Sequence, residues 1–101
     1  IWRAYSIASI ESEEFIELII RIVPNGIGSM ILDQAKIGDT FKFKGPFGHF
    51  NLSDNKTHKD KNLIFLCTGT GIAPFRSMIL EEMKHEHPRE MKLFYGGKNS
   101  R

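Results

Sequence analysis

Apolar and polar residues alternate along the first half of the chain. A period of two is found in three stretches, which are Trp2 to Ser9, Phe15 to Val23 and Thr40 to Lys44. This period is typical of strands that bury one face. In the third stretch the pattern places Phe41 and Phe43 toward the core. We therefore predict antiparallel strands with one buried side in this half.

The second half has a different pattern. Leu63 to Leu66 is an unbroken apolar run, which predicts a strand buried on both faces, as in parallel sheets. From Ile72 to His85, apolar residues recur at intervals of three and four, which predicts a helix. Its buried positions would be Phe75, Met78, Ile79 and Met83. Met91 to Tyr95 predicts another strand, and a strand–helix–strand unit is half of a nucleotide-binding domain.

Composition narrows the class of protein. Ser53 to Asn62 contains no apolar anchor, so we expect a domain boundary there. The net charge of +2 is too small to argue for a nucleic-acid or membrane-surface partner, and no apolar stretch is long enough to span a bilayer. The single cysteine, Cys67, excludes an internal disulfide and predicts a reducing compartment, hence a cytoplasmic protein. Both ends lie in or beside strand-like sequence, so we expect a piece of a longer chain.

A glycine turn joins the apolar strand to the helix. Thr68-Gly69-Thr70-Gly71 allows a tight turn and close approach of backbone N–H groups to a ligand. A strand, a glycine turn and a helix N-terminus together form an anion site, commonly for phosphate. Pro74 stands where the dinucleotide fingerprint has its third glycine, although proline suits the first turn of a helix. The spacing alone leaves a phosphate-binding turn and an ordinary strand–helix turn as open alternatives.

Other candidate residues have weaker signals. Gly26 and Gly28 precede a short predicted helix, Met30 to Ala35, for which Ser29 is the predicted N-cap. Arg76 lies in the first turn of the long helix, where a nearby phosphate would relieve its conflict with the helix dipole. His85-Glu86-His87 lacks the spacing of a zinc helix, so we predict no metal site.

Four segments together resemble the ferredoxin–NADP reductase family. They are Arg3-Ala4-Tyr5-Ser6, Gly26-Ile27-Gly28-Ser29, Gly45-Pro46-Phe47-Gly48 and Thr68 to Ser77, in the family's order along nearly the whole chain. The resemblance implies two partial domains. Residues 1–54 would be the later strands of an antiparallel flavin-binding β-barrel, and residues 55–101 the start of an α/β NAD(P)-binding domain.

The resemblance also implies roles for individual residues. Arg3 would contact the flavin phosphate, Tyr5 would pack near the isoalloxazine ring, and Ser6 would hydrogen-bond near the reactive N5, which makes Ser6 the catalytic candidate. The helix N-terminus at Gly26, Gly28 and Ser29 would receive flavin phosphate or pyrophosphate. The pyridine-nucleotide residues would be Thr68, Gly69, Thr70, Gly71 and Pro74, with Lys98, Ser100 and Arg101 near the adenosine 2′-phosphate.

These roles predict a flavin-dependent oxidoreductase. A hydride would pass from NADP(H) or NAD(H) to FAD, with FMN possible, and electrons would then reach an iron–sulfur or haem acceptor such as ferredoxin or an oxygenase component. Six residues after Tyr95 include bases and no acid, which favours NADPH. One alternative is a non-catalytic flavin-binding electron-transfer subunit that does not use NAD(P)H. Another is a nucleic-acid-binding barrel, which the core-facing register of the phenylalanines disfavours.

Overall fold

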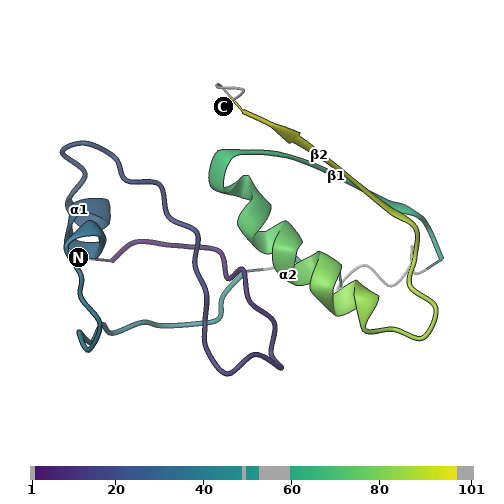
Figure 1. Ribbon diagram of the computed structural model, residues 1–101, viewed down its shortest axis with the longest axis horizontal. Coiled ribbons are helices and arrows are strands. Elements are labelled where there is room, and N and C mark those ends of the chain that lie inside the picture. Colours follow the sequence, from purple (N-terminus) through teal and green to yellow (C-terminus); the bar gives the residue numbers. More distant parts are fainter. Residues whose placement is uncertain (1, 49, 53–59, 98–101) are drawn as a thin grey trace.

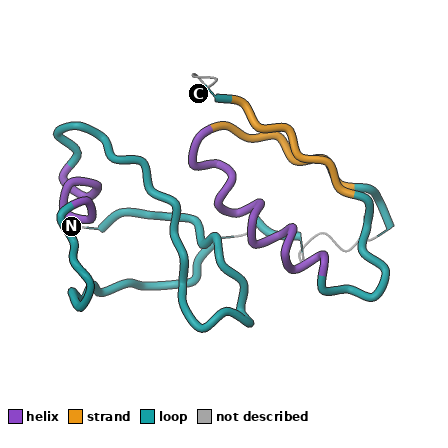
Figure 2. The backbone as a smooth tube through the Cα atoms, viewed as in Figure 1, coloured by secondary structure: helices purple, strands orange, loops and turns teal. Residues whose placement is uncertain are grey.

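The computed structural model describes residues 2–48, 50–52 and 60–97. Figure 1 gives the arrangement of its elements, which are α1 (Ile27–Asp33), β1 (Leu63–Thr68), the 3-10 turn η2 (Gly69–Gly71), α2 (Ile72–Met83) and β2 (Met91–Gly96). The first half is drawn mostly as loop around the short α1, whereas in the second half α2 runs along a two-stranded sheet (Figure 2). Within the described residues, no helix is long and apolar enough to cross a membrane.

β1 and β2 form the predicted parallel pair. Their register runs from Leu63 opposite Met91 to Thr68 opposite Gly96. Phe65 is 4% exposed because its ring packs against Phe75 of α2, with centroids 5.0 Å apart. The strand–helix–strand prediction is therefore confirmed by the observed elements.

The prediction that β1 is buried on both faces is wrong for this chain. Ile64 and Leu66 are 66% and 69% exposed. They alternate with Phe65, so they lie on the sheet face opposite α2. The apolar run has the composition of a strand covered on both faces. Among the described residues, however, α2 covers the face of Phe65, and the face of Ile64 and Leu66 stays open.

α2 begins as predicted and ends two residues earlier, at Met83. Met78 is buried, but Met83 is 59% exposed and its predicted burial is wrong. The buried residue in the last turn is Glu82 instead, at 3% exposure. Arg89 donates hydrogen bonds to Glu82 from Nε (3.0 Å) and from its backbone N–H (3.1 Å), so a charge pair takes the place expected for a methionine.

α1 differs from its predicted position. It starts at Ile27 rather than Met30, and Gly26 is its N-cap. Ser29 lies inside the helix, where its hydroxyl donates to the Val23 carbonyl (3.3 Å) and accepts from the Val23 N–H (3.0 Å). The prediction of Ser29 as N-cap is therefore wrong: this buried serine ties α1 to the chain that leads into it.

The three strands predicted in the first half do not form a regular ladder among the described residues. One antiparallel bridge joins Ile7 to Leu18, with the Ala8 N–H donating to Glu17 O at 2.8 Å. The pairing stops there because the Glu17 N–H donates to the Ser9 hydroxyl (2.9 Å) instead of a backbone carbonyl. The direction of pairing agrees with the prediction, but a closed barrel is absent from residues 2–48 and 50–52.

The core-facing assignment of the third stretch is also wrong here. Phe41 and Phe43 are 53% and 70% exposed. Their alternation with lysines is the pattern of a strand with one covered face, yet nothing in the described part of the chain covers that face. Nearby, the Lys44 ammonium lies 4.8 Å from the centre of the Trp2 ring, a cation–π contact.

Candidate functional site

The first candidate site lies where the N-terminal segment meets the start of α1. A Cβ atom added at Gly28 would lie 2.9 Å from Arg3 Cγ and 3.5 Å from the Tyr5 hydroxyl. Glycine is therefore required for this approach, because real Cβ atoms do not come within 3 Å of carbon. The structure brings together three predicted site residues, Arg3, Tyr5 and Gly28, that the sequence separates. The Arg3 methylenes lie against this helix start, while its Nη1 donates to the Trp2 carbonyl at 2.9 Å. An arginine beside a helix N-terminus is a fitting place for a phosphate group.

Gly26 and Ser29 shape the same helix start. A Cβ at Gly26 would lie 3.0 Å from both Ser29 Oγ and the Val23 carbonyl oxygen. Since the Ser29 hydroxyl bonds with Val23, we infer that the backbone of this turn, and not that hydroxyl, is available to an anion. Ser6 follows Tyr5 directly and is exposed.

The second candidate site is the turn between β1 and α2. Gly69 has φ +52°, a left-handed conformation that favours glycine, and the Tyr95 hydroxyl donates to its carbonyl at 3.1 Å. Gly71 is the N-cap of α2 with an ordinary helical φ of −60°, so the position in this turn whose conformation favours glycine is Gly69. Pro74 occupies the first turn of α2, as predicted.

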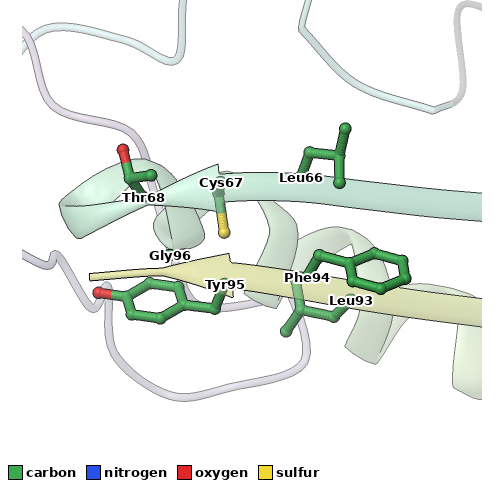
Figure 3. A pocket seen from close by; sticks show the side chains of 7 residues that line it. All are labelled: Leu66, Cys67, Thr68, Leu93, Phe94, Tyr95 and Gly96. Atoms are coloured by element: carbon green, nitrogen blue, oxygen red, sulfur yellow. The ribbon is translucent and has the colours of Figure 1, made fainter. Parts of the chain in front are cut away.

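A shallow, largely open groove adjoins this turn at the carboxyl ends of both strands, and Leu66 on its wall belongs to the uncovered sheet face. Figure 3 shows the side chains that line it, which belong to Leu66, Cys67, Thr68, Leu93, Phe94, Tyr95 and Gly96. Ligands of open α/β sheets bind outside the carboxyl ends of the strands, so the groove lies where a nucleotide is expected. Thr68 and Thr70 are both exposed at this end.

The sequence suggests that Arg76 faces a phosphate at this turn, but in the structure it points elsewhere. Its Nη1 donates to the Ala8 carbonyl at 2.7 Å, and its Nη2 lies 3.3 Å from Glu13 Oε1. The hydrogen bond from Arg76 lowers the pKa of Glu13, and the same bond raises the pKa of Arg76. Arg76 therefore has its hydrogen-bond partners in the first half of the chain, whereas the sequence suggests a phosphate as its partner.

Sequence reasoning misses Tyr95 and assigns Arg76 the wrong partner. The pattern marks Tyr95 only as the end of a strand, although the register places it opposite Cys67, within reach of the turn. The Arg76 contacts span 68 and 63 residues, and no local pattern signals them. Cys67 is half-buried, and its Cβ lies 3.5 Å from the position that a Cβ at Gly71 would take.

Three predicted site residues, Lys98, Ser100 and Arg101, lie outside the described residues. Over the ranges that are described, no group of three histidine, cysteine, aspartate or glutamate side chains is placed to hold a metal ion.

The described residues thus present one candidate site in each half of the chain. Residues 1–52 match the family model of the oxidoreductase FAD-binding domain, and residues 65–101 match that of the oxidoreductase NAD-binding domain. The chain belongs to this family of FAD- and NAD-binding oxidoreductases. The resemblance to ferredoxin–NADP reductases is thereby confirmed.

Two curated relatives of this family are similar to nearly the whole chain. The chain is 37% identical over 98 residues to methane monooxygenase component C of Methylosinus trichosporium, covering 96% of this chain and 28% of the relative. It is 38% identical over 97 residues to the toluate 1,2-dioxygenase electron transfer component of Pseudomonas putida, covering 93% of this chain and 27% of the relative. It thus spans less than a third of these curated relatives.

A solved structure agrees in three dimensions. The ferredoxin–NADP⁺ reductase of Plasmodium falciparum, solved with 2′P-AMP, matches with a TM-score of 0.74 and 29% identity. The match covers 97% of this chain and 42% of that one. The fold is therefore that of a ferredoxin–NADP reductase over this stretch.

Proposed function

We propose that the full-length protein passes a hydride from NAD(P)H to FAD and then electrons to an iron–sulfur or haem acceptor. One observation carries the proposal: the FAD-binding match at residues 1–52 and the NAD-binding match at 65–101 follow each other in one chain. The two cofactors supply the redox chemistry when bound, and the protein positions them. A ferredoxin or an oxygenase component is the proposed acceptor, since two relatives are named as components of oxygenase systems.

On the flavin side, we assign phosphate binding to Arg3 and to the α1 N-terminus at Gly26 and Gly28. The support is the close approach of Arg3 and Tyr5 to Gly28. Tyr5 would pack beside the ring system, and Ser6, next to it on an exposed segment, would hydrogen-bond near N5.

On the nucleotide side, we assign the pyrophosphate to the turn from Thr68 to Gly71 and to the first turn of α2, which contains Pro74. The groove at the ends of β1 and β2 supports this assignment. Lys98, Ser100 and Arg101 would hold a 2′-phosphate, which makes NADPH the preferred donor. The solved relative contains 2′P-AMP, a fragment with that same group.

The domain division follows from the same proposal. Residues 1–54 would belong to an antiparallel flavin-binding β-barrel completed by other parts of the full-length protein, and residues 55–101 would open the NAD(P)-binding domain. The antiparallel Ile7–Leu18 bridge and the parallel β1–β2 pair support the two sheet types. The cytoplasmic location stays a prediction, supported by the single cysteine.

The test is anaerobic mixing of the purified full-length flavoprotein with NADPH or NADH, following the flavin absorbance. Rapid bleaching by NADPH supports the proposal. A protein that holds flavin and is bleached by dithionite, but by neither nucleotide, would instead be the non-catalytic electron-transfer subunit. Chromatography of the released flavin distinguishes FAD from FMN.

A further inference from the structure

Two consecutive residues of α2 contact the first half of the chain. Arg76 donates from Nη1 to the Ala8 carbonyl at 2.7 Å and lies 3.3 Å from Glu13 Oε1 through Nη2. Its neighbour Phe75 packs against Phe50, with ring centroids 5.8 Å apart. The two contacts join parts of the chain that match different cofactor-binding models.

The Arg76 contact differs from an ordinary surface ion pair, which contributes little. Its acceptor is a backbone carbonyl of Ala8, a residue with 0% exposure. The Ala8 N–H is itself bonded to Glu17 O at 2.8 Å, so the Ala8 peptide groups are fixed on both sides. Loss of the Arg76 donor would leave a buried acceptor without this partner, which is costly.

Glu13 is also held in place. Its other carboxylate oxygen, Oε2, accepts from the Ile10 N–H at 3.1 Å, and the Glu13 N–H donates to the Ile10 carbonyl at 3.0 Å. Arg76 thus contacts a turn that is closed on itself and a backbone group that is fixed. Because neither acceptor is a freely rotating surface group, these contacts hold Arg76 in a defined position relative to the first half of the chain.

The two ends of this connection lead to the two cofactor sites. Ala8 comes two residues after Ser6, on the segment that carries Arg3 and Tyr5. Arg76 lies in α2 little more than one helical turn after Gly71, the N-cap at the nucleotide turn. In Figure 1 the N-terminal segment runs toward α2, as these contacts require.

We propose that Arg76 is a positioning residue that fixes the nucleotide-binding turn relative to the flavin-binding segment through Ala8 and Glu13. The inference rests on the proposed hydride transfer between the two sites. Arg76 contacts neither cofactor in this scheme. It sets the alignment of donor and acceptor, and a displacement of about 1 Å is enough to slow a reaction about a hundredfold.

The experiment compares Arg76→Gln and Arg76→Lys with wild type in the full-length flavoprotein. Stopped-flow reduction by NADPH separates the dissociation constant of NADPH from the limiting rate of flavin reduction. Arg76→Gln should lower the limiting rate about tenfold or more, while flavin content is kept and NADPH affinity changes less than the rate. Arg76→Lys, which keeps the charge but not the two-pronged donor, should restore part of the rate. Arg21→Gln is the control, since Arg21 is an exposed arginine in the first half of the chain.

A limiting rate of Arg76→Gln within twofold of wild type would overturn the inference. So would a loss of rate that is fully explained by lost flavin or weaker NADPH binding, because that is a structural defect. If neither NADPH nor NADH reduces even the wild-type flavin, the proposed function fails. The connection is then judged by a thermal-unfolding cycle of Arg76→Gln, Glu13→Gln and the double variant, with Glu14→Gln as control. Coupling between Arg76 and Glu13 would support the link, and strict additivity would overturn it.

Discussion

Replacing Glu82 with glutamine should remove the charge pair between the last turn of α2 and Arg89, in the connection that leads to β2. The Glu82 side chain is 2% exposed and the Arg89 side chain 17%. The guanidinium donates to Glu82 Oε1 from Nε at 3.0 Å, and the Arg89 N–H donates to Oε2 at 3.1 Å. Glutamine keeps the shape and one acceptor oxygen but leaves Arg89 without its counter-charge.

The size of the effect follows from the pKa of Glu82. The hydrogen bond from Arg89 is the main cause that lowers this pKa from 4.5 to about 2. Because the folded-state value is depressed, the carboxylate stabilises the fold above pH 4.5, and the stabilisation is lost as pH falls toward 2. The shift corresponds to about 3 kcal/mol of unfolding free energy at pH 7 and to about 1 kcal/mol at pH 3.

The assay is urea denaturation of the full-length protein and of Glu82→Gln at pH 7, 5 and 3, followed by far-ultraviolet circular dichroism. Glu82→Gln should be less stable by about 3 kcal/mol at pH 7, and the difference should narrow at pH 3. Glu81→Gln is a matched control, because the exposed Glu81 makes a 3.8 Å pair with Lys84 that contributes little. A wild-type advantage of equal size at pH 7 and pH 3 would refute the reasoning.

Three further predictions concern the cofactors of the full-length protein. Arg3→Ala should weaken flavin binding by about tenfold to a hundredfold, through loss of a charge-assisted phosphate contact; an unchanged flavin dissociation constant would contradict this assignment. Gly71→Val should keep the flavin spectrum but slow reduction by NADPH by orders of magnitude, since its side chain would fill the space of the pyrophosphate; reduction at the wild-type rate would place the nucleotide elsewhere. Arg101→Ala and Lys98→Ala should each lower the NADPH-to-NADH ratio of kcat/KM by about tenfold or more, and a ratio that does not move would leave these bases without that role.

The second half of the fold was largely predictable because its signals are local. The apolar run of β1, the glycines after it and the helical period of α2 all lie within about 20 consecutive residues. That order also favours parallel pairing, since the helix supplies the crossover that two parallel strands need. The errors fell at Met83 and Ile64, where burial depends on which partner covers a face and not on the pattern itself.

The first half was less predictable for a physical reason. Period-two alternation predicts strands, but a ladder needs a partner strand for each backbone group. Ser9 takes one of the hydrogen bonds that the second strand would have used, and sequence alone does not rank a hydroxyl against a carbonyl. The site residues Arg3, Tyr5 and Gly28 were found by motif, while their mutual contact is known from the structure alone.

The alternation of covered and uncovered positions along β1 has a consequence for mutational scanning. Substitutions at Phe65 disturb packing against α2, which is complete within this chain. Substitutions at Ile64 and Leu66 meet open space here, so any cost they carry in the full-length protein arises from whatever covers that face. A scan of six neighbouring codons in β1 would therefore separate packing against α2, at Phe65, from any packing that the full-length protein adds at Ile64 and Leu66.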